Sequence, residues 1–240
     1  MTLCYDGTRY RGWQRLPNGA LTVQGKVEEA LSEIFGMLIE VSGSGRTDAG
    51  VHAWGQVASF HAPEQPIETI VPKLRHLLPE DIGVVALSYA PDRFHARLSA
   101  TRKTYRYRLW NSAAPDVFER RFRTQILQPL DVAKMREAAK LLEGTHDFLG
   151  FCANKHFKKS SVRTLYALAV EQDGNEIRFT LTADGFLYHM ARILVGTLLE
   201  IGGGKRETAS IAEIFDKKDR ALAGETAPAK GLCLMEVRYE

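Results

Sequence analysis

The order in which strand and helix patterns follow one another limits most strongly how this chain can fold. In its first part, apolar residues recur at helical spacing in two segments, and four shorter segments have the continuous or alternating apolar pattern of strands. These patterns predict strand 2–5, helix 22–36, strand 37–42, strand 56–61, helix 66–77 and strand 82–89. Thr22 is a candidate N-cap of the first helix, and Pro66 opens the second.

The same order of elements returns later in the chain, although the two parts share no sequence identity. We expect strand 103–109, helix 131–142, strands 165–172 and 176–183, helix 187–201 and strand 232–239. A strong turn signal at residues 173–175 joins the two middle strands as a hairpin. Strand–helix–strand–strand–helix–strand is the ferredoxin-like order. The sequence therefore predicts an α+β protein of two ferredoxin-like halves, residues 1–100 and 101–240.

Composition excludes several classes of protein. A hydrophobic content of 45% and a charged content of 25% are ordinary for a soluble globular chain of 240 residues. No apolar run approaches the roughly 20 residues that span a bilayer, and the N-terminus has no signal-peptide pattern. The three cysteines are far apart and odd in number, which argues against a disulfide framework and fits a reducing cytoplasm. No Cys or His spacing indicates a metal site.

The positive charge is concentrated in one segment. Between Arg93 and Arg123 the chain has nine Lys or Arg residues and only two acidic ones, while the formal net charge of the whole chain is +3. Such a segment suggests a polyanionic partner such as nucleic acid, and the alternative is a charged, solvated face. Residues 154–161 form a second, shorter basic loop.

A loop rich in glycine, residues 43–53, is the first candidate site. Three glycines in it surround Arg46, Thr47 and Asp48. Glycines allow positive φ angles and the close approach of another molecule, so a carboxylate and a guanidinium two positions apart form a plausible reactive pair. A polar turn between two strands explains the same residues equally well. His52, at the end of the loop, is more simply a packed or surface residue than a base or ligand.

The glycine loop does not match the familiar phosphate-binding motifs, and no catalytic triad can be named from sequence spacing, because such groups meet in space. Gly45 and Gly50 have the spacing of a Walker A loop, but Val51 and His52 stand where Lys and Ser or Thr are required. Asp48 likewise stands where the dinucleotide fingerprint needs its third glycine. The glycine loop is therefore not a nucleotide-binding loop of either kind.

Two further segments offer candidate residues. Strand alternation in residues 103–109 places Tyr105, Tyr107 and Leu109 on one face and Thr104, Arg106 and Arg108 on the other. Aromatic and basic strand residues can stack bases and hold phosphates, or the tyrosines can pack under a helix. We favour packing for Tyr107 and leave Tyr105 open. Arg192 falls on the flank of the apolar stripe of its helix, where it either reaches solvent or pairs with a carboxylate.

Short motifs spread over nearly the whole chain, in order, carry a resemblance to a known family. They are Tyr5–Gly7, Gly12–Gln14, Gly45–Ala53, Leu78–Asp81, Phe94–Arg97, Lys103–Tyr107, His146–Phe148, Val162–Thr164, Gly185–Arg192, Ala227–Pro228 and Gly231–Leu232. The third resembles the catalytic signature of the tRNA pseudouridine synthase A family. The ordered set makes the chain similar to that family as a whole.

The resemblance implies isomerisation of uridine to pseudouridine at positions 38, 39 and 40 of the tRNA anticodon arm, without metal or organic cofactor. Asp48 matches the catalytic aspartate, and Arg46 matches the arginine that enters the space left by the flipped base. Tyr105 matches the tyrosine that stacks on the target base, and Arg192 the arginine that pairs with the aspartate. The resemblance also implies that the sheets of the two halves join, that a cleft between them holds the site, and that a homodimer binds one tRNA with both subunits.

Two other functions fit the same fold. One is an RNA-binding protein without catalytic activity, and the other is a synthase that modifies other uridines or other RNAs. A binding protein has no need of a carboxylate in its site, so the presence of Asp48 with Arg46, Tyr105 and Arg192 favours an enzyme.

Overall fold

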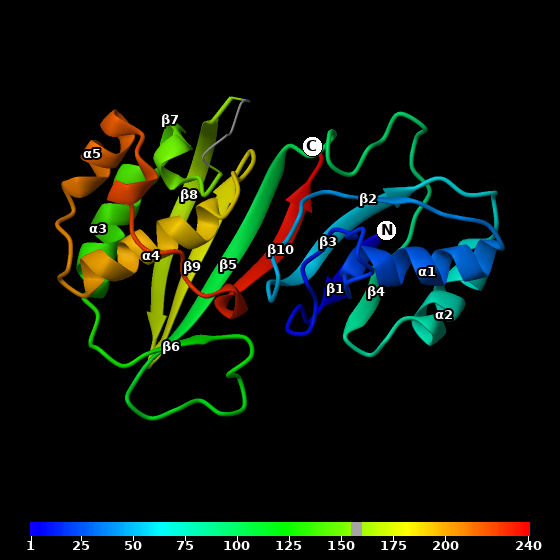
Figure 1. Cartoon of the computed structure of the whole chain (residues 1–240), viewed down its shortest axis with the longest axis horizontal. Coiled ribbons are helices and arrows are strands. Elements are labelled where there is room, and N and C mark those ends of the chain that lie inside the picture. Colours follow the sequence, from blue (N-terminus) through cyan, green and yellow to red (C-terminus); the bar gives the residue numbers. More distant parts are fainter. Residues whose placement is uncertain (155–159) are drawn as a thin grey trace. The chain divides into compact units, whose positions relative to one another are not determined.

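The computed structural model describes residues 1–154 and 160–240, so most of the basic loop 154–161 lies outside the described residues. Its contacts divide the chain into two compact units. Unit 1 contains residues 1–101 and 233–240, and unit 2 contains residues 102–232. Figure 1 shows their elements in sequence colours, and each unit is described by itself.

Unit 1 confirms the predicted order of elements. It contains β1 (Thr2–Tyr5), α1 (Val23–Phe35), β2 (Val41–Gly43), β3 (His52–Phe60), α2 (Ile67–Leu77), β4 (Ile82–Ala86) and all but the first residue of β10 (Leu232–Arg238). Strand β1 lies between β3 and β4 and is antiparallel to both. Strand β3 pairs with β2 near its C-terminal end and with β10, in parallel, near its N-terminal end.

Helix α1 begins and ends where local chemistry predicts. The side chain of Thr22 accepts a hydrogen bond from the amide of Gly25, which confirms Thr22 as the N-cap. Gly36 ends the helix with a left-handed φ of 66°. The buried face of the helix carries Val23, Val27 and other apolar residues against the sheet.

The strand predicted for residues 37–42 is wrong in its extent, because only Val41–Gly43 pair with β3. Side chains of α1 bond the backbone instead: Ser32 accepts from the amide of Ile39, and Glu28 accepts from that of Val41. These bonds draw the connection back toward the helix, so the strand begins later than its apolar sequence suggests.

Unit 2 contains five of the six elements predicted for the second half and three that the sequence analysis missed. The sixth predicted element, strand 232–239, corresponds to β10, which lies in unit 1 apart from its first residue. The elements of unit 2 are β5 (Arg102–Asn111), β6 (Thr124–Ile126), α3 (Val132–Leu142), β7 (Gly144–Asp147), β8 (Val162–Asp173), β9 (Glu176–Ala183), α4 (Met190–Gly202) and α5 (Ser210–Lys217). Short 3₁₀ turns lie at 148–151, 220–222 and 229–231. The missed elements are β6, β7 and α5. The helix predicted from residue 187 begins at Met190, because His189 has a left-handed φ of 61°.

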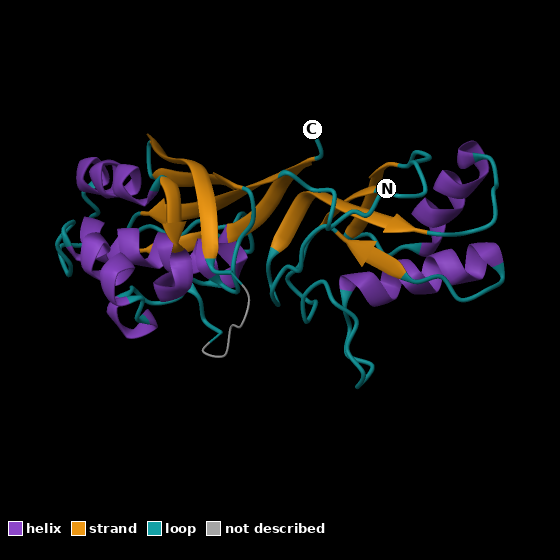
Figure 2. Ribbon diagram, turned by 90° about the horizontal axis from the view of Figure 1, so that it is seen from above, coloured by secondary structure: helices purple, strands orange, loops and turns teal. Residues whose placement is uncertain are grey.

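The sheet of unit 2 runs in the order β5, β9, β8, β7 with antiparallel pairing, and β6 pairs in parallel with β5. Helix α3 packs on β8 and beside α4 (Figure 1). Tyr105, Tyr107 and Leu109 are buried, whereas Thr104, Arg106 and Arg108 are half-buried, so the predicted alternation is confirmed. Figure 2 shows these strands in orange and the helices that flank them in purple.

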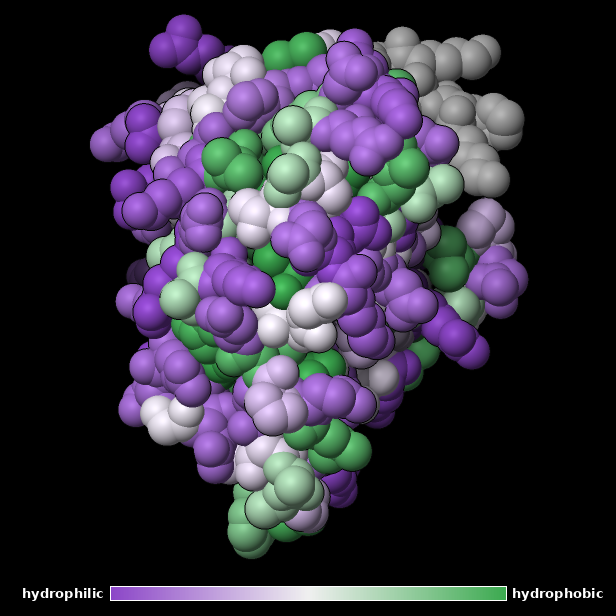
Figure 3. All heavy atoms as spheres, turned by 90° about the vertical axis from the view of Figure 1, so that its left-hand side faces the viewer, coloured by the Kyte–Doolittle hydropathy of each residue, from purple (hydrophilic) through white to green (hydrophobic). Residues whose placement is uncertain are grey.

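The end of unit 2 that carries α3 and α5 is mostly hydrophilic, with hydrophobic side chains scattered among the polar ones (Figure 3). The loop between β5 and β6 forms the lower end of that view, and its Phe118 is 91% exposed.

The α+β class, with mostly antiparallel pairing, is confirmed in both units. The division into ferredoxin-like domains at residues 100 and 101 stays a prediction. Residues 233–240, which follow the second predicted half in sequence, belong to unit 1 by their contacts. The joining of the two sheets and the cleft between the halves also stay predictions.

Candidate active site

The glycine loop lies in unit 1 between β2 and β3, and its residues differ in burial. Ser44 and Thr47 are buried, Asp48 is half-buried and Arg46 is exposed. The amide of Val51 donates to the carbonyl of Asp48, at 3.1 Å, and so closes a tight turn directly after the aspartate. The loop thus presents Arg46 and Asp48 on either side of a buried threonine.

A buried polar network fixes the side of the loop that precedes Asp48. The hydroxyls of Tyr5 and Thr47 lie 2.8 Å apart, and burial raises the pKa of Tyr5. Gln56 donates to the carbonyl of Gly45, at 2.8 Å, and accepts from the hydroxyl of Ser44, at 2.7 Å. Strands β1 and β3 supply Tyr5 and Gln56, so the sheet itself sets the position of the loop.

Residues 6–14 support the loop both before and after Asp48 by close backbone contact. The amide of Trp13 donates to the carbonyl of Thr47, at 3.0 Å. A Cβ on Gly12 would lie 2.6 Å from that carbonyl oxygen, and Gly12 has a φ of +96°. A Cβ on Gly7 would lie 2.0 Å from the carbonyl oxygen of Val51. Glycine is therefore required at both positions, which gives the motifs around residues 5–7 and 12–14 a structural reason.

Asp81, at the start of β4, anchors residues 6–14. Its carboxylate accepts hydrogen bonds from Arg9 and from the hydroxyl of Tyr10, the latter at 2.5 Å. Burial and the hydrogen bond to Asp81 raise the pKa of Tyr10 to about 12. The motif at residues 78–81 thus supports the glycine loop indirectly, because it holds the segment 6–14 that contacts the loop.

His52 is a packed residue, as the sequence indicated. It is 4% exposed, and its Nδ1 accepts a hydrogen bond from the amide of Gly7, at 3.0 Å. Asp6 Oδ1 lies 3.1 Å from the same nitrogen. These contacts tie the start of β3 to the turn after β1, and they explain the histidine without a catalytic role.

Tyr105 and Tyr107 lie in unit 2 on the buried face of β5. The ring of Tyr105 packs edge-to-face on Phe186, with centroids 5.0 Å apart, and Tyr105 is 7% exposed. Tyr107 is fully buried, and its hydroxyl bonds Thr124 and the carbonyl of Pro228. Packing is therefore confirmed for Tyr107. For Tyr105 the structure adds a neighbour, Phe186, that holds the orientation of its ring.

Arg192 lies in the first turn of α4 and is half-buried. Its Nε donates to the carbonyl of Ala227, at 2.7 Å, and the amide of Ala227 donates back to the carbonyl of Arg192, at 3.1 Å. The guanidinium is therefore held against a neighbouring backbone segment rather than extended along the helix surface toward solvent.

Part of the positive charge of the basic segment is neutralised within unit 2. Arg108 pairs with Glu176, at 2.7 Å, and with Glu119, at 3.0 Å. Arg123 pairs with Asp116, at 2.9 Å, and with Glu176, at 3.1 Å. Burial alone would raise the pKa of Glu176, but Arg108 and Arg123 outweigh burial and lower it. Glu176 lies far from these arginines in sequence, so a local count of charges could not include it.

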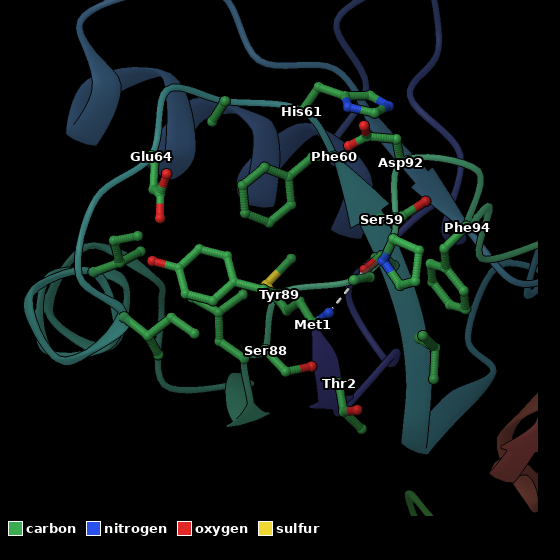
Figure 4. Close-up of a pocket in the computed structure, with 18 of the residues that line it drawn as sticks. Met1, Thr2, Ser59, Phe60, His61, Glu64, Ser88, Tyr89, Asp92 and Phe94 are labelled. Atoms are coloured by element: carbon green, nitrogen blue, oxygen red, sulfur yellow. Dashed lines mark hydrogen bonds between the residues drawn. The ribbon is translucent and has the colours of Figure 1, made fainter.

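A pocket of about 840 Å³ in unit 1 lies apart from the glycine loop. Phe60, Tyr89 and Phe94 line it beside the start of β1 (Figure 4), and neither Arg46 nor Asp48 does. Within residues 1–154 and 160–240, no group of His, Cys, Asp or Glu could hold a metal ion. No helix in the described part of the chain is long and apolar enough to cross a membrane.

The four predicted site residues thus lie in two pairs. Arg46 and Asp48 share the glycine loop of unit 1, and Tyr105 and Arg192 lie on β5 and α4 of unit 2. Sequence reasoning missed the residues that hold them, above all Gln56 and Phe186. The only signal for Phe186 was its place in the motif that ends at Arg192.

Comparison with known proteins identifies the family. A family model described as "tRNA pseudouridine synthase" matches residues 2–98 and 138–240. The chain belongs to the tRNA pseudouridine synthase family.

Several relatives of this family are similar over their full length, and each is named "tRNA pseudouridine synthase A". One from Moorella thermoacetica is 48% identical over 242 residues, covering 100% of this chain and 98% of the relative. One from Geobacillus kaustophilus is 47% identical over 240 residues, covering 99% and 93%. One from Brevibacillus brevis is 46% identical over 238 residues, covering 99% and 97%.

Among solved structures, a chain from the "Crystal Structure of a Cbf5-Nop10-Gar1 Complex" is a distant match. Its TM-score is 0.39 at 11% sequence identity, and the match covers 98% of this chain and 57% of that one. The family match and the full-length relatives, rather than this structure, establish that the chain is a tRNA pseudouridine synthase family member.

Replacing Gln56 by Leu is expected to destabilise unit 1. The half-buried carbonyl of Gly45 and the buried hydroxyl of Ser44 would each lose a partner, at a cost of about 1–3 kcal/mol in the free energy of unfolding. Urea unfolding followed by circular dichroism measures this. The exposed Gln172, replaced by Leu, is the control and should change the free energy little. A Gln56→Leu protein as stable as the wild type would contradict the role of the network.

Replacing Asp81 by Asn should cost stability in a pH-dependent way. Burial alone would raise the pKa of Asp81, but hydrogen bonds from Arg9 and Tyr10 outweigh it and lower the pKa below the ordinary 3.8. A carboxylate with a lowered pKa stabilises the fold above its unfolded value and loses this contribution as the pH falls. The difference in unfolding free energy between wild type and Asp81→Asn should therefore be largest near neutral pH and shrink below about pH 4.

Urea unfolding at a series of pH values measures this difference. Asp92→Asn, at an exposed position, serves as the matched control. A difference for Asp81→Asn that stays constant from neutral to acid pH would show that the ionised carboxylate does not anchor residues 6–14.

Proposed function

We propose that this chain isomerises uridine to pseudouridine at positions 38, 39 and 40 of the tRNA anticodon arm, with Asp48 as the essential carboxylate. Family membership supports the reaction and the tRNA substrate. The observation that carries the assignment of Asp48 is its place on a loop whose backbone is fixed on both sides, by Gln56 and Tyr5 before it and by Val51 after it.

The reaction needs one well-placed carboxylate. The bond between N1 of uracil and C1′ of ribose breaks, and a bond between C5 and C1′ forms. The hydrogen leaves C5 and N1 gains one, so product and substrate are isomers with no net oxidation or hydrolysis. Asp48 either adds covalently to a carbon or removes a ribose proton, and both routes use the same carboxylate. The reaction as written requires no metal or organic cofactor.

The other three site residues have roles in extracting and holding the base. A base inside a stem or loop must be flipped out, at a cost of a few kcal/mol. The exposed Arg46 would enter the space that the base leaves, and Tyr105 would stack on the base. Arg192 would pair with Asp48 and favour its charged form, since an opposite charge stabilises a carboxylate. The fixed ring of Tyr105 and the fixed guanidinium of Arg192 support these roles.

The proposal extends to assembly and location. The active form would be a homodimer that binds one tRNA with both subunits, and it would act in the cytoplasm, where tRNA is modified. Sedimentation of the purified protein with and without tRNA measures the assembly. A monomer that stays monomeric on tRNA and remains fully active would refute the dimer but not the reaction.

Asp48→Asn is expected to abolish turnover while preserving the fold. Loss of a positioned acid–base or nucleophilic group should lower the rate at least about 100-fold. The measurement is pseudouridine formation in an anticodon-arm transcript, and Asp92→Asn is the control at an exposed aspartate. Undiminished conversion by Asp48→Asn would refute this role. Pseudouridine mapping of tRNA from cells that lack the protein separates an enzyme from an RNA-binding protein, and it also reveals other target uridines.

Tyr105→Leu should lower kcat/KM by about 5- to 150-fold, because stacking of a base on an aromatic ring contributes about 1–3 kcal/mol. Tyr105→Phe keeps the ring and its contact with Phe186, so it should retain most of the activity. Steady-state kinetics on the same transcript compares the two. Equal losses for Leu and Phe would show that the hydroxyl, rather than stacking, is what matters.

A further inference from the structure

A backbone segment of unit 2, residues 224–228, lies against residues 192–197 of α4. We call it the strap. At one end the amide of Glu225 donates to Glu200 Oε1, at 2.9 Å. At the other end Ala227 exchanges two hydrogen bonds with Arg192, one through the backbone and one through the side chain. The strap therefore follows the first half of the helix, and the side chain of Glu200 reaches it from a later turn.

Two glycines allow the strap to approach the helix backbone. A Cβ on Gly196 would lie 1.7 Å from the carbonyl oxygen of Glu225, and a Cβ on Gly224 would lie 2.6 Å from the Cα of Thr197. The atoms that these Cβ atoms would meet belong to the backbone, which cannot move aside as a flexible side chain can. Only glycine at both positions keeps the strap at its observed distance from α4.

The hydroxyl of Thr197 then fixes the register of the strap. Thr197 is fully buried, and its Oγ1 accepts a hydrogen bond from the amide of Gly224, at 2.9 Å. The same hydroxyl donates to the carbonyl of Ile193 one turn earlier in the helix, at 2.8 Å. The strap is thus bonded to α4 through Thr197 and Glu200 at its start and through Arg192 near its end.

The consequence for Arg192 is a fixed guanidinium. A guanidinium is planar, so the hydrogen bond from its Nε to the carbonyl of Ala227 sets the plane in which its two terminal nitrogens lie. Moving the carbonyl of Ala227 would turn or shift that plane. The carbonyl of Pro228, in the strap, also accepts a hydrogen bond from the hydroxyl of Tyr107. Tyr107 lies two positions after Tyr105 on β5.

We propose that the strap is a positioning element for Arg192, and that Gly196 and Thr197 are positioning residues for the reaction. This inference rests on the proposed function, in which Arg192 pairs with the catalytic carboxylate. Neither residue contacts the substrate in this account; both act by keeping the carbonyl of Ala227 where the Nε of Arg192 needs it.

The test is a pair of double-mutant cycles with Arg192→Ala, measured as single-turnover rates on an anticodon-arm transcript with enzyme in excess. Gly196→Ala should lower the rate about 10- to 100-fold, because small displacements of a positioning group have effects of that size. Thr197→Val, which keeps the volume and loses the hydroxyl, should lower it less, and Thr197→Ser should restore it. In the Arg192→Ala background, both Gly196→Ala and Thr197→Val should change the rate by less than about twofold.

The matched control is Gly202→Ala, on the same helix, where the three atoms nearest to a Cβ all belong to the side chain of Met135, the first at 2.8 Å. It should leave the rate unchanged. Thermal melting confirms that each variant is folded, and Thr197→Val carries the test if Gly196→Ala does not fold. Equal losses with and without Arg192, or undiminished rates, would overturn the inference while wild type remains active. A wild type that converts no uridine would overturn the proposed function and this inference with it.

Discussion

The position of Thr47 is the constraint on which the candidate site of unit 1 depends. Its carbonyl accepts from the amide of Trp13, and its hydroxyl lies 2.8 Å from that of Tyr5. Backbone and side chain are thus bonded to two different segments, so neither can rotate without breaking a hydrogen bond. Arg46 and Asp48 flank this one residue, and their backbone positions follow from it. The strand pairing of β1 with β3 and the absence of a Cβ at Gly12 are both conditions for this arrangement.

Unit 2 holds Arg192 in the same way, by a close backbone approach that a glycine allows, but with different residues. In unit 1, Gly12 lets a loop come close to a carbonyl oxygen, and in unit 2, Gly196 lets a helix do so. In each case, backbone hydrogen bonds then hold the segment that carries a predicted site residue. Backbone contacts of this kind are stiffer than side-chain contacts, because they involve no rotatable bond beyond φ and ψ. Reactive groups need supports of this kind, since errors below an ångström already cost rate.

The sequence predicted what depends on local pattern. The order of the long elements, the cap at Thr22 and the packing of Tyr107 follow from spacing and alternation within a few residues. The strands β6 and β7 are short and owe their existence to partners elsewhere in the chain, so no local pattern indicated them. Helix α5 does have a local pattern, with Ile211, Ile214 and Phe215 at helical spacing, and the sequence analysis missed it because the segment is short. The pairing of Arg108 with Glu176 joins positions 68 residues apart, and the strap meets α4 through backbone atoms. The pattern of side chains along the sequence carries no information about such contacts between backbone segments.

The polar network that supports the glycine loop is built from neutral side chains, although it lies beside Arg46 and Asp48. Ser44, Thr47, Gln56 and Tyr5 are all neutral, and burial raises the pKa of Tyr5, so its phenol stays protonated wherever the protein is folded. A buried charge in their place would cost several kcal/mol to desolvate and would add its own field to that of Arg46 and Asp48. Neutral donors and acceptors fix the geometry of the loop without changing the electrostatics that the carboxylate experiences. The network thus leaves Arg46 and Asp48 as the basic and acidic side chains of this loop.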